Sequence, residues 1–224
     1  MARLARVVLP NAPHHVTQRG NRSQTVFFSD ADFAEYRGLV ATYAARAGTR
    51  ILAYCLMPNH VHFVMVPTSE DGLRAALAEA HRRYTRAINL RQDCQGHLWQ
   101  ERFHSYPMDE SHLLQAMRYV ELNPVRAGLV EDPAAWQWSS AAAHLHGKSD
   151  PLVDPADVKT IVDDWATYMT DGLPADEVEM LERHLRTGRP LADDKFLQKA
   201  EKLLNRPLRR GRPGRKAQPS TTAE

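Results

Sequence analysis

The order of strand-like and helix-like segments in the first 130 residues is the feature that most constrains the fold. Runs typical of strands occur at 16–19, 50–57, 61–66 and 104–108, and helical spacing of apolar residues occurs at 30–47, 73–90 and 111–123. The resulting order of strand, helix, strand, strand, helix, strand, helix matches a split βαβ or ferredoxin-like sandwich with one additional helix. We therefore predict an α+β fold in which an antiparallel sheet is covered by helices. Strands 50–57 and 61–66 are both expected to be central.

Three regions are expected along the chain. Residues 1–140 form the main domain, including a packed extension at Trp136–Ser140, and residues 141–205 form a helical C-terminal extension. A loop is predicted at 147–155, because glycine and proline bound it. Helices follow at 157–170, 176–187 and 195–205. The remaining residues, 206–224, are predicted to be a basic, disordered tail.

Charge is strongly segregated along the chain. Residues 1–130 contain 15 Lys and Arg against 11 Asp and Glu, residues 131–182 contain 2 against 12, and residues 183–224 contain 12 against 4. A basic body and a basic tail favour a polyanionic partner such as nucleic acid, although such runs also occur as merely solvated faces. The chain contains no apolar run of about 18 residues, so we expect no membrane span and a cytoplasmic location.

The two cysteines, Cys55 and Cys94, form no CxxC pair. The pattern therefore indicates neither a thiolate zinc site nor a secreted disulfide scaffold. A metal site would have to use other ligands. His60-Val61-His62 offers two, because the period of two in a strand places both imidazoles on one face. A lone HxH is more often only hydrogen-bonded. His144-Leu145-His146 has the same spacing without a flanking apolar strand, and we interpret it as structural.

The helix predicted at 111–123 presents a second pair of chemical groups. Tyr119 and Asn123 are four residues apart, so a phenol and an amide oxygen share one helix face. Such a pair suits phosphoryl chemistry. The plainer alternative is a core tyrosine followed by an asparagine at the helix C-terminus.

Three segments resemble the REP-associated tyrosine transposases, relatives of the insertion-sequence transposases of the HUH single-tyrosine type. They are Val16–Arg22 (VTQRGNR), Met57–Val64 (MPNHVHFV) and Tyr119–Val130 (YVELNPVRAGLV). The resemblance extends over roughly residues 8–140. It implies the HUH endonuclease fold, with His60 and His62 as metal ligands, Tyr119 as the nucleophile and Asn123 at the third ligand position, where related transposases often have glutamine.

The same resemblance implies a metal-dependent single-strand DNA endonuclease and strand transferase. Its substrate would be hairpin-flanked DNA such as a repetitive extragenic palindrome, cut through a 5′-phosphotyrosine intermediate. Imidazole and oxygen ligands fit Mn²⁺ or Mg²⁺, and zinc also binds imidazole. We expect a monomer or a homodimer, associated with the nucleoid.

Further residues are predicted to contact DNA, because basic side chains track phosphates and aromatic rings stack on bases. The polar and basic candidates are Arg19, Asn21, Arg22, Arg82, Arg83, Arg86, Arg102, Arg210 and Arg212, the last two beside a GRP sequence like that of minor-groove hooks. The aromatic candidates are Tyr84, Trp99 and Phe103, for which a place in the core is the commoner alternative.

Two other functions stay open at this level. A non-catalytic nucleic-acid-binding module of ferredoxin-like fold would also combine a sheet with basic helices, although the aromatic pattern usual on its central strands is missing. A metal-dependent hydrolase would use water in place of Tyr119. A protein–DNA adduct that resists denaturant would separate all three.

Overall fold

The computed structural model describes residues 6–209 and contains one four-stranded antiparallel sheet. Its strands are β1 (His14–Arg19), β2 (Arg50–Met57), β3 (His60–Val66) and β4 (His104–Pro107), in the order β2-β3-β1-β4. Each neighbouring pair runs antiparallel. With two helices in the crossovers, this is the ferredoxin-like arrangement. The predicted α+β fold class is confirmed.

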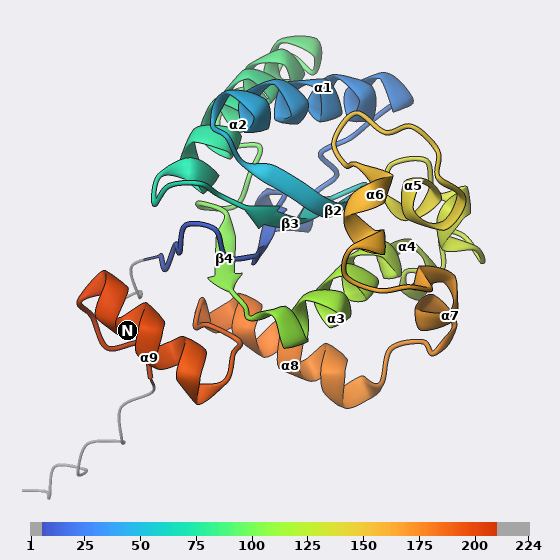
Figure 1. The fold of residues 1–224 in the computed structure, drawn as a ribbon. Helices are drawn as coiled ribbons and strands as arrows, with labels where there is room; N and C mark the ends of the chain where they lie inside the picture. The colour runs from blue at the N-terminus through green and yellow to red at the C-terminus, as the bar shows by residue number, and fades with distance from the viewer. Residues whose placement is uncertain (1–5, 210–224) are drawn as a thin grey trace, which may run out of the picture.

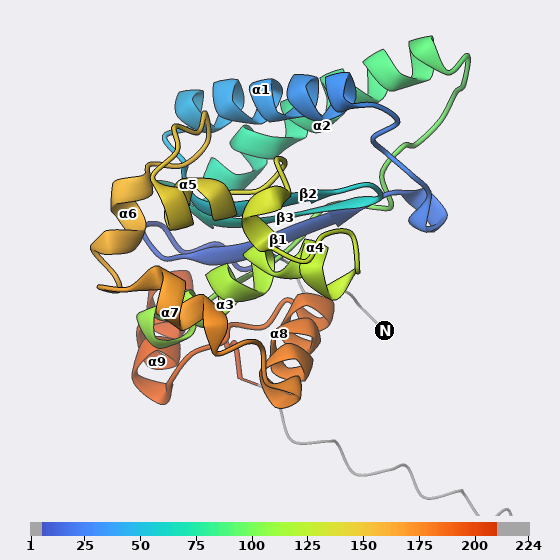
Figure 2. The ribbon, with the colours of Figure 1, turned by 90° about the vertical axis from the view of Figure 1, so that its right-hand side faces the viewer.

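Helices cover both faces of the sheet, as the ribbon views show (Figures 1 and 2). α1 and α2 lie together on one face, whereas α3 and α8 lie on the other. Each face buries its own cluster of apolar side chains. The helices are η1 (Asn21–Ser23), α1 (Asp30–Arg46), α2 (Gly72–Arg91), α3 (Glu110–Glu121), α4 (Asn123–Arg126), η2 (Pro133–Ala135), α5 (Ala141–His146), α6 (Pro155–Lys159), α7 (Trp165–Thr170), α8 (Ala175–Thr187) and α9 (Asp194–Leu204).

The two helices on the first face follow directly from the sequence pattern. Ser29 caps α1 by accepting a hydrogen bond from the Asp32 N–H, and the apolar residues of α1 at three- and four-residue spacing face the sheet. In α2 the apolar residues at helical spacing are all buried, while Arg82, Arg83 and Arg86 on the other side of the helix are exposed. The inward set is Leu73, Leu77, Ala80, Tyr84 and Ile88.

The prediction that β2 is central was wrong, because β2 forms an edge of the sheet. Its free edge is covered by the Trp136–Ser140 extension. The Leu56 N–H donates to the Trp138 carbonyl, and the Ser140 N–H donates to the Tyr54 carbonyl. From Ile51 to Met57 the strand therefore has the buried, largely apolar sequence of a central strand, since the extension occupies its outer side.

The start and end of α3 also differ from the prediction. α3 begins at Glu110, before the predicted residue 111, and its cap is Asp109, whose side chain accepts from the His112 N–H. It ends at Glu121, before Pro124, which lies in the first turn of the one-turn helix α4, where the lack of an N–H is tolerated. Asn123 therefore sits at a junction between two helices.

The C-terminal extension is helical, but the helix predicted at 157–170 is two short helices, α6 and α7. Asp164 breaks the run because its side chain caps α7. The tail was predicted to start at residue 206, yet Leu208 is buried and its N–H bonds to Glu201. Packing thus continues to residue 209, the last one described. Within residues 6–209, no helix is long and apolar enough to cross a membrane.

Candidate active site

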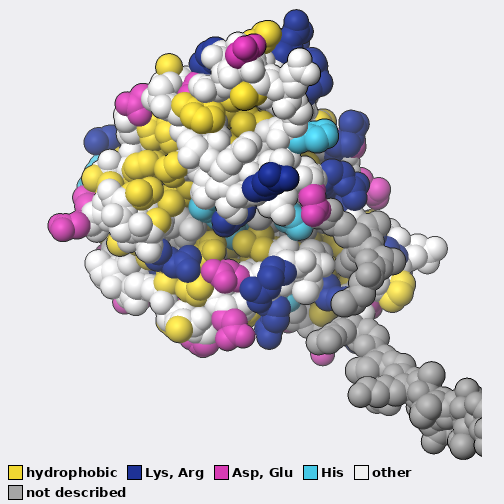
Figure 3. All heavy atoms as spheres, turned by 180° about the vertical axis from the view of Figure 1, so that it is seen from behind, with side chains coloured by type: hydrophobic (Ala, Val, Ile, Leu, Met, Phe, Trp, Pro, Cys, Tyr) yellow, Lys and Arg dark blue, Asp and Glu magenta, His cyan; other side chains and the backbone are white. Residues whose placement is uncertain are grey.

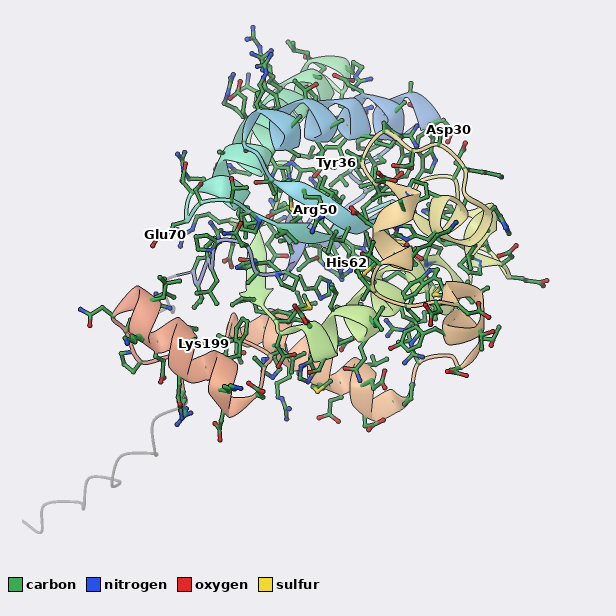
Figure 4. The ribbon with its side chains drawn as sticks, viewed as in Figure 1. Asp30, Tyr36, Arg50, His62, Glu70 and Lys199 are labelled. Carbon is green, nitrogen blue, oxygen red and sulfur yellow. The ribbon has the colours of Figure 1, made fainter. Side chains whose placement is uncertain are left out.

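β3 carries His60 and His62 on the sheet face that looks toward α3, while Val61 and Phe63 pack toward α1 and α2. Figure 4 shows His62 between the sheet and α3. A cavity of about 510 Å³ opens at this face, which we call the Tyr119 cavity. It is lined by Thr17, Arg19, Met57, His60, His62, Gln100, His104, Tyr119, Asn123, Arg126, Ala127, Glu182, Leu185 and Arg186. The sheet and α3 thus bring the four predicted catalytic and metal-binding residues to one cavity.

The two imidazoles are oriented by hydrogen bonds to their Nδ1 atoms. Nδ1 of His60 lies 2.6 Å from Oδ1 of Asn59, and Nδ1 of His62 lies 3.0 Å from Nε2 of His15. The other nitrogen of His15 contacts the Tyr106 hydroxyl at 3.1 Å. These contacts hold both rings in place. Nδ1 of His60 donates to the Asn59 oxygen, which leaves the lone pair of the His60 Nε2 free, and the Nε2 of His62 is free in the same way when its Nδ1 donates to His15.

The pKa values keep both imidazoles neutral. Burial, with a smaller contribution from Arg19, lowers the pKa of His60 to about 4. Burial also holds the pKa of His62 well below its ordinary value. Each ring therefore carries a free lone pair at neutral pH, which metal coordination requires.

Tyr119 lies against this pair, with its ring centroid 5.7 Å from that of His62. The Arg126 guanidinium sits over the Tyr119 ring at 4.8 Å. Burial raises the pKa of the phenol, and a hydrogen bond from Arg126 partly opposes this effect. Arg126 is thus placed to stabilise a phenolate as it forms.

Asn123 is 93% buried and its amide is held in one orientation. Its Nδ2 donates to the Tyr119 carbonyl at 2.8 Å and to the Val120 carbonyl. Because the amide nitrogen is engaged with backbone, the oxygen is the atom available to the Tyr119 cavity.

These residues fit a divalent cation through the chemistry of their donors. Among residues 6–209, no group of three or more His, Cys, Asp or Glu side chains could hold a metal ion. A site here would combine the two histidine Nε2 atoms with the Asn123 oxygen, and water or phosphate oxygens would complete the shell. Imidazole with oxygen ligands suits Mn²⁺ or Mg²⁺.

Three residues of the site escaped the sequence reasoning. His15 contacts His62 from the neighbouring strand β1, Arg126 stacks on Tyr119, and Glu182 of α8 faces Arg126 at 3.6 Å. Arg126 stood inside the NPVRAGLV segment and could have been suspected. Nothing in the local sequence signals Glu182, because its place depends on how α8 folds back over the sheet.

The residues predicted to contact DNA lie in several separate places on the structure. Arg19 lines the Tyr119 cavity, and Asn21 and Arg22 form the exposed turn that follows β1. Arg82 and Arg83 both pair with Glu79 on the surface of α2, and Arg86 lies exposed on the same helix. Arg102 lines a different cavity. Arg210 and Arg212 lie outside the described residues.

Figure 3 shows the surface on the far side from Figure 1, where Lys and Arg side chains gather on the side on which α2 lies. The proposed stacking aromatics do not contribute to that surface. Tyr84, Trp99 and Phe103 are each at least 92% buried and belong to the apolar cluster under α1 and α2. For these three rings the core interpretation holds.

The surroundings of the second HxH motif, His144-Leu145-His146, indicate a structural role. His144 lies on α5, fully buried, and its Nδ1 bonds to the Glu121 carboxylate. The same carboxylate accepts hydrogen bonds from Ser140 and from the Trp165 indole N–H. Glu121 thereby ties α3 to α5 and α7, and His144 is a partner of this carboxylate.

Five histidines whose pKa values are lowered, three of them buried and two partly buried, make stability sensitive to acid. Burial lowers the pKa of His14 and His60 to about 4 and that of His15 and His81 to about 3, and His62 shifts the same way. Because the folded-state pKa values lie below the unfolded pKa of 6.5, the stability that the neutral histidines contribute is fully present above pH 6.5. It is lost as pH falls toward 4. At pH 5.5 each group is expected to cost about 1 kcal/mol.

We therefore predict that the free energy of unfolding of metal-free protein drops by several kcal/mol between pH 7 and pH 5.5. Urea titrations in the presence of chelator measure it. His15→Gln should reduce the drop, whereas replacing the exposed His97 should leave it unchanged. Equal free energies at the two pH values would refute the neutral state of these side chains.

The sequence matches the family described as transposase IS200 like over residues 10–123, about half of the chain. It is 28% identical over 100 residues to a Haemophilus influenzae protein named as a REP-associated tyrosine transposase. That match covers 40% of this chain and 57% of the relative, so the chain spans little more than half of the relative's length.

The fold has a solved counterpart. A REP-associated tyrosine transposase bound to a REP hairpin superposes with a TM-score of 0.56 at 18% sequence identity. The superposition covers 68% of this chain and 90% of that one. At this identity the likeness concerns the fold.

Proposed function

The chain belongs to the IS200-like transposase family, and on that premise we propose that it is a metal-dependent endonuclease and strand transferase of single-stranded DNA. The observation that carries the proposal is the meeting of Tyr119, His60 and His62 at one cavity. A phenol beside two neutral imidazoles suits attack on a phosphodiester, because the imidazoles can hold a cation against the anionic oxygens.

In this proposal the Tyr119 oxygen attacks phosphorus and the bond to the 3′ oxygen breaks. The products are a 5′-phosphotyrosine and a free 3′-hydroxyl, which takes up the proton that the phenol loses. Arg126 favours the attack by stabilising negative charge on the phenol oxygen, against the effect of burial. Because the covalent bond keeps the energy of the phosphoester, a second 3′-hydroxyl can reverse the step and join another strand.

His60, His62 and Asn123 would hold the divalent cation. Once bound, it would supply charge neutralisation on the phosphate and orient the group that is cut. The chain itself contributes the preset geometry, since Asn59, His15 and the Tyr119 carbonyl each fix one of the three ligand side chains. We propose Mn²⁺ or Mg²⁺ as the ion.

The substrate proposed is hairpin DNA with a short single-stranded flank. The solved counterpart is bound to a REP hairpin, and Arg19 at the mouth of the Tyr119 cavity can contact a phosphate. Cutting of an end-labelled REP hairpin in manganese, and its loss with chelator, tests the proposal. An intact hairpin under both conditions would speak against it.

We propose that His15 is a positioning residue for the metal site. It contacts Nδ1 of His62, and its ring packs edge-on against the Tyr119 ring with the centroids 5.6 Å apart. His15→Ala is expected to weaken Mn²⁺ binding by about 10- to 100-fold, the usual effect of losing a partner of a metal ligand. His15→Gln should restore most of the affinity, because its amide can replace both contacts. Electron paramagnetic resonance of Mn²⁺ measures binding without any cleavage.

The matched control is the neighbouring His14, which is equally buried but bonds to the Leu9 N–H and the Ala12 carbonyl. His14→Ala should lower stability and leave the Mn²⁺ affinity unchanged. An unaltered Mn²⁺ affinity in His15→Ala would show that His62 needs no partner.

A further inference from the structure

The Tyr119 cavity contains a carboxylate at the place where a DNA strand is proposed to bind. Among the described residues that line the cavity, Glu182 of α8 is the one carboxylate. Three arginines line the same cavity, namely Arg19, Arg126 and Arg186. A carboxylate repels the phosphates that arginines attract. Glu182 therefore opposes the binding of DNA, unless it serves another purpose at this site.

The contacts of Glu182 indicate such a purpose. Its Oε1 lies 3.6 Å from Nη2 of Arg126, and the guanidinium carbon of Arg126 lies 4.8 Å from the centre of the Tyr119 ring. The Arg126 side chain is 34% exposed, so packing alone does not fix it. A long side chain that is free at its end adopts several rotamers. The carboxylate thus restricts the guanidinium to the position over the phenol.

α8 provides a rigid support for this carboxylate and lies beside α3 (Figures 1 and 2). Near the start of α8, Glu177 accepts a hydrogen bond from the buried Arg118 of α3 at 2.8 Å. Beyond its end, the Leu191 N–H donates to the last carbonyl of β4 at 2.9 Å. Between these anchors, Leu181 is fully buried in the apolar cluster of that face. The place of Glu182 relative to α3 is therefore fixed.

A carboxylate near two histidines is also a familiar kind of metal ligand. Within residues 6–209, however, no group of three or more His, Cys, Asp or Glu side chains is arranged to hold an ion. Glu182 therefore does not form such a group with His60 and His62. Its contact with Arg126 favours a role in positioning that arginine.

We propose that Glu182 is a positioning residue that holds the Arg126 guanidinium against Tyr119 during strand cleavage. This inference rests on the proposed function, in which Arg126 stabilises negative charge on the phenol oxygen. Glu182 lies beyond residue 123, where the match to the transposase family ends. The C-terminal extension would then take part in the active site through α8.

Glu182→Gln tests the assignment, because it keeps the size of the side chain and removes its charge. The cleavage rate at saturating hairpin and manganese should fall about tenfold, since misplacing a catalytic group costs up to about a hundredfold. Hairpin affinity, measured by filter binding with chelator present, should not fall, because a charge that repels phosphate is removed. Glu182→Asp retains the charge on a shorter side chain and should recover part of the rate.

The matched control is Glu179→Gln, which removes the same charge from an exposed position one turn earlier on α8. Glu179 is not among the residues that line the Tyr119 cavity. Its replacement should leave the cleavage rate and the hairpin affinity at the wild-type values.

A double-mutant cycle shows whether Glu182 acts through Arg126. Arg126→Ala alone should slow cleavage by about a hundredfold, the usual effect of losing a group that stabilises developing charge. Adding Glu182→Gln should cause no further loss, because the group that Glu182 holds is then absent. Electron paramagnetic resonance should give equal Mn²⁺ affinities for the wild type and Glu182→Gln.

Three outcomes would overturn the inference while leaving the proposed function intact. The first is a Glu182→Gln protein that cleaves as fast as Glu179→Gln. The second is an equal loss of rate from Glu182→Gln with and without Arg126, which would mean that Glu182 acts by another route. The third is a loss of Mn²⁺ affinity in Glu182→Gln, which would make Glu182 a metal ligand. A wild-type protein that cuts no hairpin would overturn both the inference and the proposed function.

Discussion

Tyr119→Phe is expected to abolish strand cleavage and the covalent adduct while the protein stays folded and binds hairpin DNA. Only the attacking oxygen and its hydrogen bond with Arg126 are lost, and the ring keeps its packing against His62. Loss of an enzyme nucleophile lowers the rate by roughly four to six orders of magnitude, whereas one hydrogen bond contributes only about 1 kcal/mol to stability. Gel assays of cleavage and filter binding of the same hairpin measure the two effects separately.

Tyr43→Phe is the matched control, because Tyr43 lies on α1, across the sheet from the site. It should cleave like the wild type. A Tyr119→Phe protein that still cuts at a comparable rate would exclude Tyr119 as the nucleophile and favour hydrolysis by water.

His60→Ala and His62→Ala are each expected to remove metal-dependent cleavage. Either change deletes one of the two proposed imidazole ligands at the Tyr119 cavity, and the proposed ligands that remain would be a single imidazole and a neutral amide. We expect a loss of at least about a thousandfold in rate at moderate manganese concentration, since the cation is proposed to carry the phosphate charge. Mn²⁺ titrations by electron paramagnetic resonance should show the same loss in binding.

The chain provides its own control in the motif of equal spacing on α5. His146→Ala, at an exposed position, should leave both Mn²⁺ binding and cleavage intact. His144→Ala is a stability variant: it strips a partner from the buried Glu121, which we expect to cost about 3 to 5 kcal/mol. If His146→Ala impaired Mn²⁺ binding as strongly as His60→Ala, the wrong pair would have been chosen.

The sequence predicted the first sandwich layer well because its signals are local. Ser29 caps α1, and period-two alternation puts His60 and His62 on the face opposite Val61 and Phe63. The predicted resemblance to REP-associated tyrosine transposases is also confirmed by the family match and by the Haemophilus relative. Each of the three segments that resemble the family can be recognised from a few consecutive residues.

The errors arise where distant segments meet. β2 was assigned to the centre of the sheet because its sequence from Ile51 onward is almost wholly apolar, but residues 138–140 supply the missing cover from more than 80 residues away in the sequence. His15 could not be identified as a partner of His62, because that contact depends on the register between β1 and β3. Glu182 reaches the site only through the path of α8, which no periodicity encodes.

The measurement that tests the central claim most directly is mass spectrometry of the trapped protein–DNA adduct. Wild-type protein is incubated with a hairpin in manganese, denatured, treated with nuclease and digested with protease. Our account predicts a nucleotide joined through its 5′ phosphate to the peptide that contains Tyr119, and no such peptide when chelator is present. A cut hairpin with no modified peptide, or a nucleotide on any other residue, would contradict it.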